Sequence, residues 1–114
     1  MAAAKIPFED IMAEIEQKTA NFDGSNYHGF LALQVNLTDL DKVFYVEVKD
    51  HKLTIAPFEY NDRQAKMSMK SGNFQKMING QLSGTTAFLT QKLKIEGSIE
   101  KCKELTALLG GNVD

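Results

Sequence analysis

The chain has 114 residues, with 13 basic and 15 acidic side chains and a formal net charge of −2. A chain of this length typically forms one domain, so we expect residues 1–114 to fold as a single unit. The balanced charge argues against nucleic acid as a partner, because such surfaces carry an excess of Lys and Arg. Cys102 is the only cysteine, which excludes an intramolecular disulfide and fits a reducing compartment.

Neither a secretory leader nor a membrane span is expected from the sequence. The first residues, MAAAKIPFED, lack a long apolar run, and no later window approaches the roughly 18 apolar residues of a membrane span. The final residues, GGNVD, lack a Ser-Lys-Leu-like peroxisomal address. We therefore expect a soluble, cytoplasmic protein that makes at most transient contact with a membrane surface.

A helix is predicted at the start of the chain. Four apolar residues follow the i, i+3, i+4, i+7 spacing of one helix face: Phe8, Ile11, Met12 and Ile15. Pro7 suits the first turn of this helix. Residues 21–29, rich in Gly, Asn and Ser, then predict a loop.

Strands are predicted from residue 30 onward, where the hydrophobic period changes to two. Residues 30–37 alternate apolar with polar side chains, and residues 42–58 repeat the pattern twice. Asp50 and His51 form the connection of a predicted hairpin. Such a two-residue turn requires a positive φ, which costs a His about 1 kcal/mol.

The next segment predicts one more strand and a second helix. Residues 65–70 alternate, with Met67 and Met69 on the inward side. Residues 71–80 return to helical spacing. Asn79 and Gly80 can end this helix in left-handed geometry.

Residues 87–97, AFLTQKLKIEG, alternate as a fifth strand. On this period Gln91 falls on the apolar side, together with Leu89. Two interpretations stay open. In one, a bulge turns Gln91 outward. In the other, its amide faces the interior and requires a polar partner, because an unpaired buried amide costs about 1–3 kcal/mol.

A last helix is predicted from Ile99 to about Leu109, with Ser98 as its N-cap. The elements are therefore helix, four strands, helix, strand, helix. Strands with one polar face and helices with one apolar stripe satisfy each other when the helices lie on one face of a single sheet. The expected fold class is α+β in two layers, with one five-stranded, mixed but mainly antiparallel sheet.

The residues give no positive sign of catalysis, a metal site or a cofactor. His28 and His51 lie in predicted loops without the spacing of zinc ligands. Cys102 falls on the apolar side of the last helix, where a buried core thiol is the favoured interpretation over a nucleophile. No phosphate-binding Gly-rich loop is present.

Three stretches resemble a known family: FYVEVKDHKLTI at residues 44–55, GQLSGTTAFLTQKLKIEGS at residues 80–98, and the Leu-rich closing helix. Together they are similar to the sterol carrier protein type-2 family of lipid-transfer domains, over a core of about residues 8–109. This resemblance implies an apolar tunnel, between the sheet and the helices, that accepts fatty acids, fatty acyl-CoAs or sterol-like lipids. Gln91 stands where the family commonly has Gly.

The resemblance, combined with the inward-facing positions, predicts the residues that line the tunnel. The set is apolar apart from one amide, and it is rich in methionine, whose unbranched thioether adapts to irregular apolar shapes. Its members are Met12, Ile15, Leu33, Phe44, Val46, Met67, Met69, Phe74, Met77, Ile78, Leu89, Gln91, Leu105 and Leu108. If Gln91 faces the tunnel, it selects a lipid with a polar group at that depth.

The leading expectation is non-catalytic lipid binding and transfer, with a lipid as the partner. One alternative is a stand-alone module that presents an apolar substrate to a partner enzyme. Another is an interaction or dimerisation domain with a closed, dry core.

Overall fold

The computed structural model describes residues 5–26 and 29–111. Its five strands are β1 (Leu31–Leu37), β2 (Lys42–Lys49), β3 (Lys52–Ala56), β4 (Ala65–Met69) and β5 (Leu93–Gly97). They form one sheet in the order β3-β2-β1-β4-β5. The β1–β4 pair is parallel and the other three pairs are antiparallel, so the predicted mixed sheet is confirmed.

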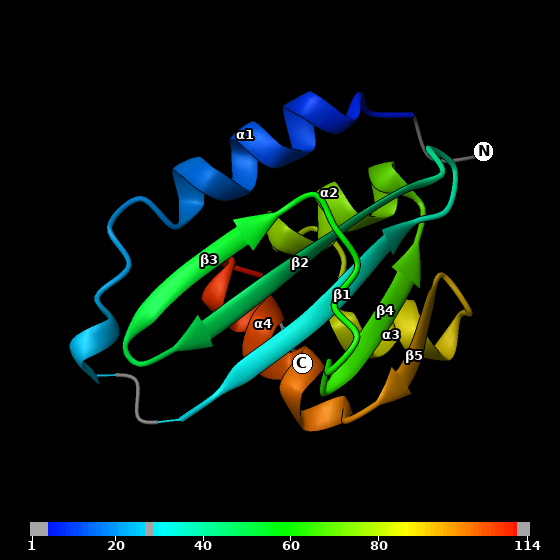
Figure 1. Ribbon diagram of the computed structural model, residues 1–114. Helices are drawn as coiled ribbons and strands as arrows, with labels where there is room; N and C mark the ends of the chain where they lie inside the picture. Colours follow the sequence, from blue (N-terminus) through cyan, green and yellow to red (C-terminus); the bar gives the residue numbers. More distant parts are fainter. Residues whose placement is uncertain (1–4, 27–28, 112–114) are drawn as a thin grey trace.

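The helices are α1 (Phe8–Lys18), α2 (Ser71–Ile78), α3 (Gly84–Leu89) and α4 (Ile99–Leu108), with a 3-10 turn η1 (Gly24–Asn26). In Figure 1, α2, α3 and α4 lie behind the sheet, and α1 runs along its β3 side. The helices therefore cover one face, as the α+β interpretation requires.

The core lies between this face and the helices. Because strand side chains alternate, every second residue of each strand faces the helices. The fully buried strand side chains on this face are Leu31, Leu33, Val35, Leu37, Phe44, Val46, Val48 and Met67. Strand register places them in rows, with Val35 opposite both Phe44 and Met67.

The hairpin between β2 and β3 has the predicted two-residue turn. Asp50 has φ 52° and His51 has φ 66°, so both central residues adopt the left-handed conformation of a type I′ turn. The His51 Nδ1–H donates to the carbonyl of Gly24 at 2.7 Å. A Cβ at Gly24 would lie 1.8 Å from the His51 carbonyl oxygen, so only glycine permits this contact.

The face opposite the helices is partly covered by the connection from β3 to β4, residues 57–64, which crosses in front of β2 and β1 (Figure 1). Gln34, on the polar side of β1, is therefore only 3% exposed. Its Oε1 accepts from the Tyr60 N–H at 3.1 Å, and its Nε2 donates to Asn36 at 2.8 Å. The central strand is thus buried on both faces, although its sequence alternates.

The start of α2 is fixed by a carboxylate from the loop after β1. The N–H and hydroxyl of Ser71 donate to the two oxygens of Asp39, at 2.8 and 2.7 Å. The Ser71 hydroxyl oxygen also accepts from the Ile6 N–H at 2.9 Å. Burial raises the pKa of Asp39, but the hydrogen bonds from Ser71 outweigh it, so this pKa lies below its usual value.

The prediction of a strand over residues 87–97 was wrong in its first half. Ala87, Phe88 and Leu89 belong to α3, whose N-cap Ser83 accepts from the Thr86 N–H at 3.0 Å. The strand begins only at Leu93. A helix of six residues is shorter than two turns, so its apolar residues mimic the alternation of a strand.

Candidate functional site

A groove opens where α3, β5 and α4 meet, at the edge of the sheet. Its volume is about 200 Å³. The side chains around it come from all three elements and are mostly apolar. The lining residues are Gly84, Thr85, Phe88, Leu89, Leu93, Ile95, Ile99, Cys102, Lys103 and Thr106.

The base of the groove carries no reactive group. Cys102 is 3% exposed, and burial raises the pKa of its thiol to about 12. The thiol is therefore neutral at physiological pH and is a poor nucleophile. The Thr106 hydroxyl donates to the Cys102 carbonyl at 2.9 Å. The hydroxyl hydrogen of Thr106 is therefore already used within α4.

The rim of the groove exposes large apolar side chains to water. Leu89 is 73% exposed, and Phe88 and Ile99 are 43% and 48% exposed. Lys103 carries the one charge among the lining residues. Isolated exposed apolar residues are ordinary, but three around one concave surface indicate a place that an apolar partner covers.

Most residues predicted to line a tunnel lie in the hydrophobic core. The ten buried ones are Ile15, Leu33, Phe44, Val46, Met67, Met69, Phe74, Met77, Ile78 and Leu105, and Met12 and Leu108 are half-buried against them. Leu89 is the one member of the predicted set that lines the groove. Contact of the core residues with a ligand stays a prediction.

Of the two interpretations left open for Gln91, the one in which its amide faces the interior is contradicted. Gln91 is exposed, has φ 63° and lies in the turn between α3 and β5. The left-handed conformation breaks the alternation, which turns the side chain outward. This is the outward interpretation that the family's Gly suggested.

Sequence reasoning missed much of the groove, including Phe88, Ile95 and Lys103. Two signals were available. Ser83 is a residue type favoured at helix N-caps, and Ile99 belongs to the apolar side of the predicted last helix.

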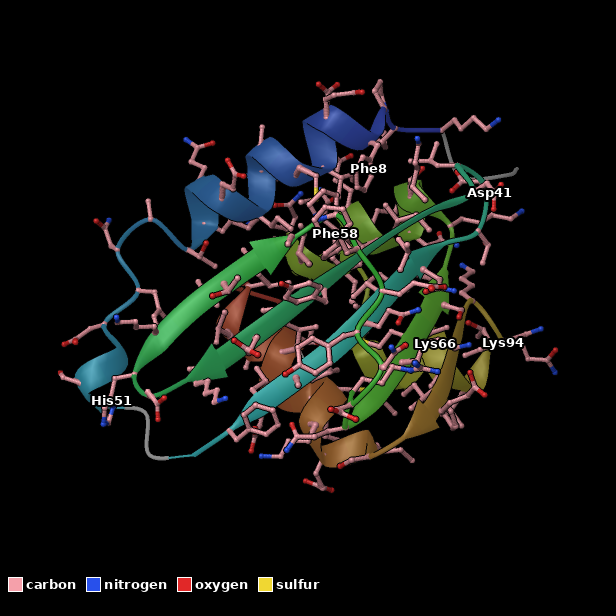
Figure 2. The ribbon with its side chains drawn as sticks, viewed as in Figure 1. Phe8, Asp41, His51, Phe58, Lys66 and Lys94 are labelled. Carbon is pink, nitrogen blue, oxygen red and sulfur yellow. The ribbon has the colours of Figure 1, made fainter. Side chains whose placement is uncertain are left out.

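A second hollow of about 520 Å³ lies between the end of α1, the segment that follows it and β3 with its hairpin turn. It is lined by Glu16, Thr19, Phe22, His51, Lys52, Leu53 and Ile55. Charged and apolar side chains are mixed around it. Figure 2 shows His51 at the hairpin end of the molecule, far from β5. His28 lies outside the described residues.

In residues 5–26 and 29–111, no three His, Cys, Asp or Glu side chains gather as metal ligands. Within the same residues, no helix has the length and hydrophobicity to cross a membrane. The groove between α3, β5 and α4 is concave and mostly apolar, with few polar side chains. Such a lining is typical of a site for an apolar small molecule.

The sequence pattern of the SCP-2 sterol transfer family matches residues 13–110. The chain therefore belongs to this family, and the resemblance found in the sequence is confirmed. The chain is also 46% identical over 44 residues to hydroxysteroid dehydrogenase-like protein 2 of Xenopus tropicalis. That match covers 39% of this chain and only 11% of the relative.

Two solved structures illustrate the shared fold. A double mutant of the sec-alkyl sulfatase PisA1 superimposes with a TM-score of 0.77 at 14% identity, covering 96% of this chain and 17% of that chain. Sterol Carrier Protein-2 from Aedes aegypti, in complex with the C16 fatty acid palmitate, gives a TM-score of 0.63 at 18% identity, covering 89% of this chain and 92% of that one. At these identities the likeness shows the fold.

Proposed function

We propose that this protein is a non-catalytic, cytoplasmic carrier that binds the apolar chain of a fatty acid, fatty acyl-CoA or sterol-like lipid at the groove between α3, β5 and α4. The observation that carries the proposal is the exposed apolar rim of Phe88, Leu89 and Ile99 around a concave apolar surface. Membership of the SCP-2 sterol transfer family, and the palmitate complex of the Aedes aegypti protein, support it.

The driving force is burial of methylene groups. Each buried methylene contributes about 0.8 kcal/mol, so an acyl chain has enough apolar surface to offset the cost of association. The neutral thiol of Cys102 is compatible with this apolar contact.

The groove of about 200 Å³ lies below the roughly 300–1,000 Å³ of most ligand pockets. It holds part of an acyl chain, and a complete lipid requires the helices to move apart. The short helix α3 is the element best suited to move, because its six residues bury little surface.

The experiment is native mass spectrometry of the freshly purified protein, followed by organic extraction and displacement of a fluorescent fatty acid. A stoichiometric lipid adduct, and displacement by added lipid, are expected. Leu89→Asp should weaken binding of the probe at least tenfold, because it places a carboxylate at the rim. Phe58→Asp, at an apolar residue exposed elsewhere, is the matched control and should bind normally. Equal loss in both variants, or no binding by the unmodified protein, would overturn the proposal.

A second function is favoured by the lengths of the relatives. The matched segments make up 11% of a dehydrogenase-like protein and 17% of a sulfatase, so both relatives are much longer than the part that resembles this chain. The alternative is a module that presents an apolar substrate to a separate enzyme. It predicts that the lipid-loaded protein raises the activity of a co-purifying enzyme, and that the Leu89→Asp variant does not.

A further inference from the structure

β5 is an edge strand whose outer side has no partner among the described residues. The sheet order ends at β5, which pairs with β4 alone. Unpaired edges present free N–H and C=O groups, and these can accept another strand. The chemistry of this edge therefore determines whether it repels or attracts a second chain.

The hydrogen-bonding groups at the centre of β5 point outward. Ser98 N–H donates to the Gln64 carbonyl at 3.1 Å. Because hydrogen-bonded pairs alternate along an antiparallel ladder, the same register makes Glu96 and Lys94 the residues bonded to β4. The N–H and C=O of Ile95 consequently face the free edge.

The charged side chains of β5, Lys94 and Glu96, complement those of a second β5 in antiparallel orientation. If a second β5 adds in antiparallel orientation around a two-fold axis at Ile95, the two Ile95 residues exchange both backbone hydrogen bonds. Lys94 of each copy then lies directly opposite Glu96 of the other, in the closely spaced kind of pair. Lys94 forms no ion pair within the described residues, so it is available for this contact.

Glu96 can serve both chains. Its Oε2 binds Lys66 Nζ at 2.6 Å, yet its side chain remains 69% exposed. Figure 2 shows Lys66 and Lys94 at the same end of the sheet. Lys66 lowers the pKa of Glu96 through a hydrogen bond, which keeps the carboxylate ionised for a second cation.

The neighbouring registers are disfavoured. Shifting the pairing by two residues in one direction sets Glu96 opposite Glu96 of the other copy, and a shift in the other direction sets Lys94 opposite Lys94. Like charges directly opposite each other destabilise a strand pair. Within β5 itself, Leu93–Gly97, only the register centred on Ile95 therefore sets opposite charges opposite each other.

We propose that β5 is a self-association surface, through which two copies of this chain form a two-fold dimer with a continuous sheet across the pair Ile95–Ile95. Both copies then place their helices on the same face, and the apolar grooves lie beside the new strand pair. A five-residue strand buries less than the roughly 1,200 Å² of a stable interface, so the dimer is weak and depends on concentration.

The first test measures mass and amide exchange on the same purified protein. Sedimentation over a dilution series should show a monomer–dimer equilibrium that weakens with added salt, because the ion pairs at the edge are screened. The Ile95 amide should exchange fast in dilute protein and slow at high concentration, whereas the Lys94 amide, bonded to β4, stays protected throughout. A monomer at every concentration, with a fast Ile95 amide, would overturn the proposal.

Variants identify the surface. Lys94→Glu should abolish the dimer, and the matched control Lys49→Glu, an equal change of charge at the exposed end of β2, should keep it. The triple variant Lys66→Glu, Lys94→Glu and Glu96→Lys inverts every charge, preserves the pair within each chain and should restore association. A dimer that survives Lys94→Glu assembles through another surface and contradicts the inference. The mass of the dimer is measured without added lipid, so failure of this test can be distinguished from failure of the lipid-binding test.

Discussion

The sheet carries two contrasting halves on the same face. Over β1 and β2 the side chains of α1 and α2 close a core. In it, the centroid of the Phe44 ring lies 5.8 Å from that of Phe74 and 6.4 Å from that of Phe8. Over β5, by contrast, the six-residue α3 leaves Phe88 and Leu89 exposed around a groove. One half is a closed core, and the other leaves apolar side chains exposed to water.

The largest expected effect is a loss of stability in the closed half, over β1 and β2. Phe74→Ala should lower the free energy of unfolding by about 3–5 kcal/mol, because Phe74 is fully buried and its removal leaves a cavity. Leu89→Ala, in the open half, should change it by less than about 0.5 kcal/mol. Urea unfolding of both variants makes the comparison. If they cost the same, the distinction between the halves is wrong.

A smaller effect concerns the anchor of α2. Asp39→Ala should cost about 2 kcal/mol, because it removes two hydrogen bonds to a carboxylate. Since the folded pKa of Asp39 is lowered, its contribution is present above about pH 4 and is lost as pH falls through that lowered pKa. Unfolding measured against pH should show this acid-side loss in the unmodified protein and less of it in Asp39→Ala. The exposed Asp62→Ala serves as the control.

The smallest expected effect is a change of stability at Gln91, in the open half next to β5. Gln91→Gly should stabilise the protein by about 1 kcal/mol, because glycine adopts φ 63° without strain. Gln91→Val should destabilise it, since a β-branched residue is disfavoured there. Thermal unfolding tests both variants. Lipid affinity should be unchanged in Gln91→Gly, because Gln91 does not line the groove; altered affinity would revive a direct role for the amide.

The sequence predicted the elements whose pattern repeats over enough residues. The alternation of β1 to β4 and the turn at Asp50 and His51 were confirmed, as were the helix ends: Gly80 has φ 76°, and Ser98 accepts from the Lys101 N–H at 3.2 Å. These features are local, so local chemistry decides them.

The groove was not predictable in the same way. Residues 84–97 hold a short helix, a strained turn and a strand, and the strand period was extended over all three. The lining of the site depends on how far α3 and α4 stand apart over β5, which is a property of tertiary packing. Hydrophobicity alone places Leu89 and Phe74 in one class, although Leu89 is 73% exposed and Phe74 is buried.

The parallel pairing of β1 with β4 bears on the order of folding. β1, β2 and β3 are joined by short turns, whereas Leu33 pairs with Ala65 across a long connection. Closing long loops is slow relative to forming hairpins, so we expect the three-stranded meander to form first and the β4–β5 half to join it later. Pulse-labelling of amides during refolding, with β2 protected before β5, would show this sequence. Native-state opening should follow the reverse route, so that the edge with the groove is the first part of the sheet to fluctuate.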